Sequence, residues 1–396
     1  TALRPIIPIG KVSVALDIVF YIDQNGNIHD DEWDFSDGKK SRNSIIDKIY
    51  YIRYGKKWDP FYFQVGALDN VTLGKGILVN RYTNTILYPQ VRKVGMDIKF
   101  KVSGFNFYGF TNDFKENLGL TGFRVSKNII NGINIGGSMV ADRNQYLGLR
   151  DSDNDGRPDL VDDFPDDPLY WLDTDGDGIA DVDPNELDID GDGVTDTLDS
   201  NIPGWDLDSI YVLDTDIMRK PEPLNVQNRK RSIYAVSLDA SKTILAESNM
   251  SVSIYAQFAS LIGKTVDPIS AEEVSLGNGF IPFGISTKLG PARFKFEYRM
   301  MPSGKFEFGY WDRSYEIERA TFSSSFMNDN SGLRTGEIIT KDSRLGKFGK
   351  QKGYFSTLSI DLGELVGASM SYQNLFGEQW NENESCLLYT SPSPRD

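Results

Sequence analysis

Strict alternation of apolar and polar side chains, in segments of about nine to twelve residues, constrains this chain more than any other feature. In residues 292–300 every second side chain is apolar, and the positions between them hold Arg293, Lys295, Glu297 and Arg299. Residues 94–102 follow the same rule, with Lys99 and Lys101 on the polar side. Side chains two residues apart share one face of a strand. Helical periodicity is scarce, so we expect an all-β protein.

The alternation predicts thirteen strands, whose connections differ in length. The connections after odd-numbered strands are mostly long, and those after even-numbered strands are short. We expect the strands at residues 11–23, 45–54, 61–69, 93–102, 104–112, 119–127, 132–142, 232–241, 249–259, 279–289, 292–301, 353–361 and 365–375.

Strand length and loop asymmetry together predict the architecture. An up-and-down barrel in an outer membrane has short turns on one side and long loops on the other. Strands of about 9–11 residues span the hydrocarbon layer when tilted. We therefore predict an antiparallel up-and-down transmembrane β-barrel of at least 13–14 strands, in a truncated chain, with an irregular calcium-binding loop insert. Residues 8–142 and 232–377 resemble outer-membrane β-barrel proteins of Gram-negative bacteria in this general pattern.

Aromatic residues and two connecting segments supply further expectations. The chain has 19 Tyr and 23 Phe, and those near strand ends are predicted to form interfacial girdles. They include Tyr50, Tyr51, Tyr54, Trp58, Phe61, Tyr108, Tyr310 and Trp311. Residues 70–92 could fold inward as a constriction, and residues 306–317 are expected to continue as strand beyond the membrane. A soluble β-sandwich is the alternative, and Pro282 inside the tenth strand weakens the barrel interpretation.

The acidity of the chain is confined to one block. The net charge is −15, but residues 151–206 alone carry −19, so the rest carries +4. A global basic patch for nucleic acid is absent. Within the block, the pattern D-x-D-x-D-G-x-x-D occurs three times, starting at Asp151, Asp173 and Asp188.

This spacing suits calcium. Ca²⁺ prefers six to eight hard oxygen ligands, and carboxylates at alternate positions of a curled loop converge on one point. The glycine after the third Asp permits the sharp turn. The candidate ligands of the first loop are Asp151, Asp153, Asp155, Asp159 and Asp162. Those of the second loop are Asp173, Asp175, Asp177 and Asp181, and those of the third are Asp188, Asp190, Asp192, Asp196 and Asp199.

The three loops resemble thrombospondin type 3 repeats, over about residues 151–200. The resemblance implies calcium binding with little regular secondary structure. The cysteines common in animal repeats are absent, and Pro184 occupies the late acidic position of the second unit, with Asp183 one residue early. An acidic disordered linker is the alternative. An EF-hand is disfavoured because prolines interrupt the flanking helices it would need.

These features divide the chain into four parts. Residues 1–142 and 207–384 are predicted to form the barrel, residues 143–206 the calcium insert, and residues 385–396 a non-native tail that resembles translated sequencing-adapter read-through. The insert follows an odd-numbered strand, which predicts an extracellular position on an outer-membrane protein. The expected partners are the outer-membrane lipid bilayer and calcium ions.

The expected function is a channel or uptake protein with a calcium-stabilised surface loop. The alternatives are a calcium-dependent adhesin anchored by a barrel and a soluble secreted calcium-binding β protein. A polar barrel interior could be an open pore or a plugged interior whose charges pair with one another. No catalytic constellation stands out, because His29 is the single histidine and Cys386 the single cysteine.

Overall fold

The structure of the chain is a computed structural model. It describes residues 2–3, 5–19, 21–22, 28–29, 48–57, 59–88, 91–191, 193, 195–196, 220, 222–267, 270–326, 334–361, 367–377 and 383–391. The chain forms two compact units. The first comprises residues 1–143, 232–317 and 342–396, and the second comprises residues 144–231 and 318–341.

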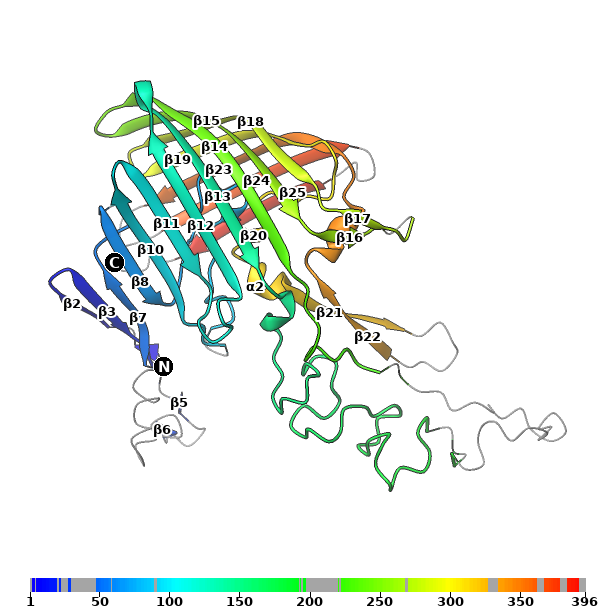
Figure 1. Ribbon diagram of the computed structural model, residues 1–396. Helices are drawn as coiled ribbons and strands as arrows, with labels where there is room; N and C mark the ends of the chain where they lie inside the picture. The colour runs from blue at the N-terminus through cyan, green and yellow to red at the C-terminus, as the bar shows by residue number, and fades with distance from the viewer. Residues whose placement is uncertain are drawn as a thin grey trace. The chain divides into compact units, whose positions relative to one another are not determined.

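The first unit is built on one antiparallel sheet of fifteen strands, each paired with its neighbours along the chain (Figure 1). Its strands in order are β2 (Ile6–Ile9), β3 (Val12–Leu16), β7 (Ile49–Tyr54), β8 (Phe61–Gly66), β10 (Gly95–Val102), β11 (Phe105–Thr111), β12 (Leu120–Asn128), β13 (Ile133–Asp142), β14 (Ile233–Ala246), β15 (Met250–Ile262), β18 (Asn278–Leu289), β19 (Ala292–Met301), β23 (Gln351–Asp361), β24 (Gly367–Gly377) and β25 (Asn383–Ser391). The all-β, antiparallel up-and-down architecture predicted from the alternation is confirmed.

Short elements complete the two units. In the first unit they are β1 (Ala2–Leu3), β4 (Ile18–Val19), β5 (Tyr21–Ile22), β6 (Ile28–His29), β9 (Val79–Asn80), η1 (Ile130–Gly132), β16 (Lys264–Val266), β17 (Glu273–Ser275), β20 (Trp311–Asp312) and η4 (Ser343–Lys347). In the second unit, η2 (Gln145–Gly148) lies in the insert, and β21 (Ala320–Phe326) pairs with β22 (Arg334–Thr340). Helix α2 (Tyr315–Glu318) lies where the chain passes between the units. No helix in the described part of the chain is long and apolar enough to cross a membrane.

All thirteen predicted strands are present, and the sheet has two more. β2 pairs with β3 at the start, and β25 pairs with β24 at the end. The segment predicted as the first strand is broken, because β3 ends at Leu16 and β4 and β5 follow separately. Residues 383–391 pair as a strand although the tail was expected to be non-native, and the origin of that tail stays a prediction.

Pro282 lies in a bulge of β18, which explains how a proline fits inside the sheet. On one side the pairing shifts between Tyr255 and Gln257, and on the other it shifts between Phe280 and Phe283. A proline has no backbone N–H to give to a ladder, so sheets accept it at bulges. The bulge therefore accommodates Pro282, the residue that had weakened the barrel interpretation.

Connection lengths alternate along the sheet as the sequence predicted. One edge carries the short connections 10–11, 55–60, 103–104, 129–132, 247–249, 290–291 and 362–366. The other edge carries 17–48, 67–94, 112–119, 143–232, 263–277, 302–350 and 378–382. Four of the latter exceed twenty residues, and the insert belongs to this edge.

The two faces of the sheet have polarities opposite to those of a water-soluble sheet. On one face Met139 and Leu238 are 63% and 62% exposed. On the other, Arg124, Asp239 and Glu297 are at most 8% exposed. Directly paired residues share a face, and the pairing places all the charged side chains predicted to face inward on this second face. They are Lys99, Lys101, Arg293, Lys295, Glu297 and Arg299.

The charged face curves around a segment of its own chain, residues 67–88, named here the first inward segment. Its residue Lys75 donates its backbone N–H to Gln257 of β15 at 3.2 Å, and Lys295 of β19 donates to the carbonyl oxygen of Lys75 at 2.7 Å. Arg81 donates to the hydroxyl of Ser369 on β24 at 3.0 Å. Because strands far apart in the sheet order contact one segment, the sheet wraps around it, as expected of an inward-folded constriction.

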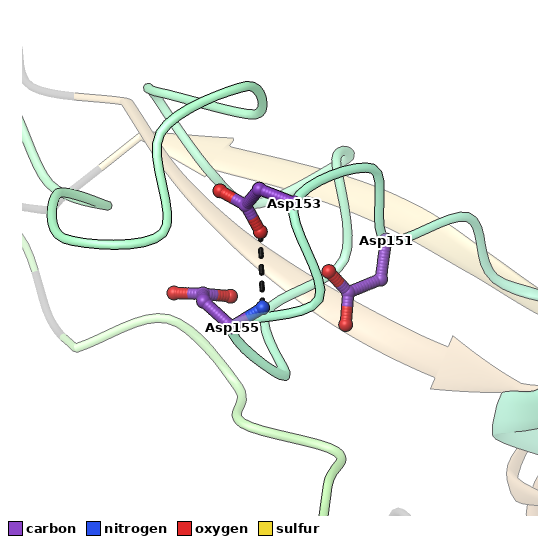
Figure 2. Close-up of side chains that lie close together, drawn as sticks. All are labelled: Asp151, Asp153 and Asp155. Atoms are coloured by element: carbon purple, nitrogen blue, oxygen red, sulfur yellow. Dashed lines mark hydrogen bonds between the residues drawn. The ribbon is translucent and has the colours of Figure 1, made fainter.

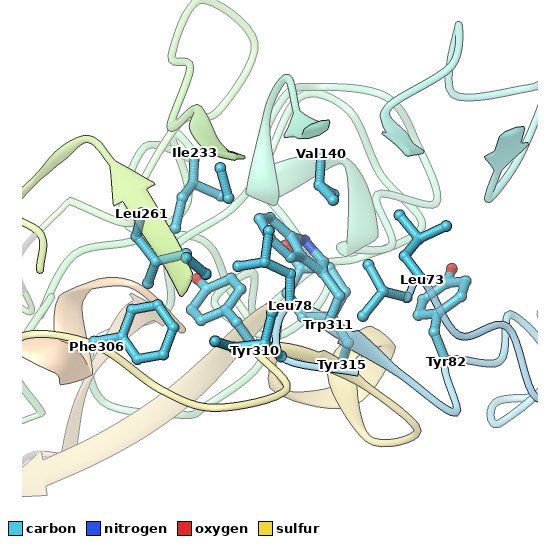
Figure 3. Packing of buried hydrophobic residues seen from close by; sticks show 14 of the residues in the cluster. Leu73, Leu78, Tyr82, Val140, Ile233, Leu261, Phe306, Tyr310, Trp311 and Tyr315 are labelled. Atoms are coloured by element: carbon cyan, nitrogen blue, oxygen red, sulfur yellow. The ribbon is translucent and has the colours of Figure 1, made fainter. Parts of the chain in front are cut away.

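A second inward segment, residues 302–317, packs against the first. β20 pairs in parallel with β9, which places Trp311 opposite Val79. The side chains of Tyr82, Tyr310 and Tyr315 are fully buried in the same cluster (Figure 3). The core of the first unit therefore lies inside the curve of the sheet, where long connections fill it.

This packing corrects two predictions. Residues 306–317 do not continue as strand beyond a membrane, because their aromatic side chains are buried in the interior core. Tyr108, Tyr310 and Trp311 are also buried there and belong to no girdle. Trp58 lies outside the described residues. Alternation could not reveal this, because it describes strands and gives no direction for a long connection.

Candidate metal sites

The first acidic loop brings three of its predicted ligands together (Figure 2). Carboxylate oxygens of Asp151, Asp153 and Asp155 all lie within 4.8 Å of one another. Asp151 accepts hydrogen bonds from the backbone N–H groups of Asn154 at 2.8 Å and Gly156 at 3.1 Å. Asp153 accepts from the N–H of Asp155 at 3.0 Å. These bonds curl the backbone around its own carboxylates.

The second loop repeats this frame at the same offsets. Carboxylate oxygens of Asp173, Asp175 and Asp177 also lie within 4.8 Å of one another. Asp173 accepts from the N–H groups of Gly176 at 2.7 Å and Gly178 at 3.0 Å. The three acids come together although the late acid of this unit is displaced by a proline.

The third loop shares the part of the frame that the structure describes. Asp188 accepts from the N–H of Gly193 at 2.9 Å, which is the same offset as in the other two loops. Asp190 is described, whereas Asp192 and Asp199 lie outside the described residues. The ligand set of this loop stays a prediction.

The acid at the ninth position of each motif has a bracing role in the structure. Asp159 accepts from the backbone N–H and the hydroxyl of Ser152 at 2.7 and 2.8 Å. Asp181 makes the same pair of bonds to Thr174, each 2.7 Å long. Asp196 accepts from the N–H of the equivalent residue in the third loop at 3.0 Å. Among the described residues, these acids are not part of the two clusters of three.

Two positions in each loop take the left-handed backbone conformation. The glycine at the sixth position has φ of +95°, +94° and +93° in the three loops, as expected for the sharp turn. The fourth position does the same, with φ of +66° at Asn154, +83° at Gly176 and +69° at Gly191. This role of the fourth position was not predicted, although Asn and Gly are the residues that adopt the left-handed conformation most readily.

Asp162 is not part of the first cluster of three, but it interacts electrostatically with Asp155 and Asp153. It is only 7% exposed, and its Oδ1 accepts from the N–H of Phe164 at 2.8 Å. Oδ2 of Asp162, Oδ2 of Asp153 and Oδ1 of Asp188 are buried and have no hydrogen-bond partner among the described residues. A buried, unpaired carboxylate oxygen is costly, and a cation would satisfy it.

The electrostatics of the first loop also favour a bound cation. Burial, followed by the neighbouring charges of Asp155 and Asp153, raises the pKa of Asp162 to about 6. The pKa of Asp151 is also raised, first by burial, against the effect of its two backbone hydrogen bonds. Carboxylates crowded in this way resist ionisation, and a divalent cation between them would remove that resistance.

Arg157, the single basic residue of the acidic block, supports the first loop from outside. Its guanidinium donates to Oδ2 of Asp155 at 3.1 Å and lies 3.7 Å from the ring centre of Trp171. The indole N–H of Trp171 donates to Glu222 at 3.0 Å. The contacts of Trp171 were not predicted, since they join residues far apart along the chain.

The displaced late acid of the second unit is used elsewhere. Asp183 accepts from the hydroxyl of Tyr170 at 2.7 Å and from the N–H of Asn185 at 2.8 Å. The pKa of Asp183 is lowered by these hydrogen bonds, beginning with the one from Asn185. Its carboxylate is therefore held away from the second cluster by partners of its own.

Comparison with known proteins leaves the family of the chain open. No protein-family model and no curated protein matches it. Among solved structures, a triple mutant of the Rhodopseudomonas blastica porin is 8% identical, with a TM-score of 0.32, over 98% of this chain and 89% of that chain. The outer membrane channel DcaP of Acinetobacter baumannii is 8% identical, with a TM-score of 0.33, over 98% and 84%. Scores this low carry no argument, so the fold rests on the strand pairing described above.

Proposed function

We propose that the chain is a Gram-negative outer-membrane β-barrel protein that works as a channel or uptake protein, with a calcium-stabilised extracellular loop. One observation carries the membrane part of this proposal. The sheet exposes large apolar side chains such as Met139 and Leu238 on one face and buries charged ones such as Arg124 and Glu297 on the other. A sheet in water shows the reverse polarity, whereas a barrel in lipid turns its apolar face outward.

The edges of the sheet support the same assignment. Connections are all short on one edge and mostly long on the other, which is the arrangement of an outer-membrane barrel with its short turns in the periplasm. The acidic insert leaves from the long edge, between β13 and β14. This position favours the cell surface for the insert.

Calcium is the cation that fits the insert best. The two described clusters offer carboxylate oxygens and no histidine or cysteine, and hard oxygen ligands favour Ca²⁺ or Mg²⁺ over zinc or copper. Loops closed by backbone hydrogen bonds can adapt to the irregular coordination that Ca²⁺ accepts, whereas Mg²⁺ demands near-ideal octahedral geometry. In this proposal Asp151, Asp153, Asp155 and Asp162 bind one ion.

In the second loop, Asp173, Asp175 and Asp177 bind another ion. The predicted ligands at the ninth positions act in this proposal by bracing their loops. The third loop is proposed as a further site through Asp188 and Asp190, with the other ligands that the sequence predicts.

Membrane insertion and conduction are tested with the folded protein. The protein should require detergent for extraction, and it should migrate differently on a gel before and after boiling. In a planar bilayer it should produce discrete conductance steps. Full aqueous solubility would defeat the membrane proposal, and a fully inserted but electrically silent protein would favour an anchor over a channel.

Calcium binding is tested separately by calorimetry. The folded protein should release or absorb heat as Ca²⁺ is titrated to millimolar concentration. A variant with Asp153→Asn and Asp175→Asn should lose most of that heat. Asp166→Asn serves as the matched control, because Asp166 lies in the same acidic block but in neither cluster. No heat from the unaltered protein would defeat the calcium proposal and leave the barrel proposal untouched.

A further inference from the structure

A cavity of about 700 Å³ lies inside the curve of the main sheet. Its lining comes from the two inward segments and from strands β15, β18, β19, β23 and β24. This volume falls within the range of about 300–1,000 Å³ that is usual for small-molecule sites. The interior is therefore narrowed by the inward segments and is not completely filled by them.

The charge of the cavity is one-sided. Of the twenty described residues that line it, five are cationic and none is acidic. Lys75, Arg81 and Arg313 come from the inward segments, while Arg293 and Lys295 come from the wall. Cations thus line the cavity on both the loop side and the strand side.

Two acids near the cavity in the described part of the chain are already engaged by other groups. Glu297 accepts from Lys295 at 2.7 Å, from Arg299 at 2.6 Å and from the hydroxyl of Tyr255 at 2.8 Å. The negative charge of Glu297 therefore compensates the positive charges of Lys295 and Arg299 on the same strand. This part of the interior is a self-paired ladder, as one of the sequence alternatives held. Glu297 itself does not line the cavity, whose described lining residues include five cations and no acid.

A second acid, Asp239, is paired in the same way. Asp239 accepts from Arg124 through both carboxylate oxygens.

Lys75 lies on the first inward segment, outside the strands. Burial and the nearby charge of Lys295 lower the pKa of Lys75. An anion bound beside Lys75 would stabilise the protonated, charged form of its side chain.

Hydroxyl groups accompany the cations. Thr72, Ser286, Thr357 and Ser371 line the cavity, and Ser369 accepts from Arg81 at 3.0 Å. Guanidinium groups donate two parallel hydrogen bonds to carboxylate or phosphate oxygens, and hydroxyl groups donate to the same oxygens. The lining therefore matches oxyanions better than halide ions or neutral solutes.

We propose that this cavity binds small polyvalent oxyanions that carry carboxylate or phosphate groups, and that it makes passage through the barrel selective for anions. The selectivity part rests on the proposed channel function, whereas the binding part does not. Field focusing in a narrow, low-dielectric space raises the local concentration of anions there.

The test combines conduction with binding. In a planar bilayer under a KCl gradient, the reversal potential of the unaltered protein should show anion selectivity. The double variant Lys75→Gln with Arg293→Gln should lower the chloride-to-potassium permeability ratio severalfold. Lys264→Gln is the control, because Lys264 is exposed in an ion pair with Glu273 and does not line the cavity. Cation selectivity of the unaltered protein, or an unchanged ratio in the double variant, would overturn the selectivity.

Binding is measured on the detergent-folded protein in calcium-free buffer, with citrate and with inorganic phosphate as probes. The double variant should bind the preferred probe at least tenfold more weakly, while Lys264→Gln binds it normally. Stronger binding of citrate identifies carboxylates as the preferred group, and stronger binding of phosphate identifies phosphates. If neither probe binds, the site proposal fails even where the channel conducts. If a probe binds but no conductance is seen, the channel proposal fails and the site stands. Heat-modifiable migration confirms that each variant is folded.

Discussion

Both carboxylate oxygens of Asp181 accept hydrogen bonds from Thr174, one from its backbone N–H and one from its hydroxyl, each 2.7 Å long. The bonds join the second and ninth positions of the acidic motif. They close the loop around Asp173, Asp175 and Asp177, which occupy the first, third and fifth positions. The ninth acid therefore shapes the loop that holds the other three.

Removing the hydroxyl tests this bracing role without touching a proposed ligand. Thr174→Val keeps the volume of the side chain and the backbone hydrogen bond to Asp181, but it deletes the hydroxyl's bond to the carboxylate and its bond from the N–H of Lys220. Hydrogen bonds to charged groups contribute about 1.5–3 kcal/mol, so calcium should bind the second loop about tenfold more weakly or worse. Calorimetric titration measures the change.

The third loop supplies the control for that variant. Its second position is Ile189, whose N–H alone bonds to Asp196 at 3.0 Å. Ile189→Val removes no hydroxyl and should leave calcium binding nearly unchanged. Equal losses in the two variants would show that the effect comes from packing, since both side chains are buried.

Gly178 tests the turn conformation separately from steric fit. Its φ is +94°, and a Cβ placed there would meet no atom within 4 Å. Gly178→Ala should therefore act through backbone strain alone, at about 1–2 kcal/mol, and weaken calcium binding roughly tenfold. Gly178→Asn should weaken it less, because Asn154 adopts the left-handed conformation in the first loop. Calorimetry on both variants would contradict this expectation if asparagine were the more damaging substitution.

The sheet was predictable from sequence because its signal is local. Alternation over each strand fixes which residues share a face, so the sequence alone places Lys295 and Glu297 on the same side of their strand. The paths of the two inward segments were harder to predict from the sequence. Trp311 and Val79 pair across more than two hundred residues, and no periodicity links them. Apolar residues in a long connection are equally consistent with further strand.

The acidic loops were likewise predictable from the sequence only in part. The positions of Asp151, Asp153 and Asp155 follow from a spacing that repeats, and the structure brings these acids together. The hydrogen bonds from Ser152 to Asp159 were not predicted, because the spacing of the motif does not show which groups its ninth acid contacts. The role of Asp159 as a ligand stays a prediction. The left-handed conformation at the fourth position could have been predicted, because the sequence has Asn154 and two glycines there.

Leu238, near the middle of β14, distinguishes lipid from water on the apolar face. It is 62% exposed. On a water-facing surface Leu238→Arg should change stability by no more than about 0.5 kcal/mol. On the lipid face of a barrel, near the bilayer midplane, the same change should cost about 2–4 kcal/mol and reduce insertion into vesicles. The folded fraction is measured by heat-modifiable migration.

Leu160→Arg is the matched control for that experiment. Leu160 lies in the acidic insert and is 51% exposed. An arginine there should leave insertion unchanged, because the proposed position of the insert is outside the membrane. Equal folded fractions for the two arginine variants would argue against a lipid-facing sheet.

Glu297 is fully buried and holds two cations of its own strand, Lys295 and Arg299. Glu297→Gln keeps the shape but leaves both cations without their carboxylate, and loss of one partner of a buried ion pair costs about 3–5 kcal/mol. Urea unfolding of the protein in lipid vesicles should show this loss, whereas Glu273→Gln, in the exposed pair with Lys264, should show little change. Adding Arg299→Gln to Glu297→Gln should recover part of the stability, because the second change removes one of the two uncompensated charges. Strictly additive losses would mean that Glu297 and Arg299 do not act as a pair, despite the 2.6 Å separating their atoms.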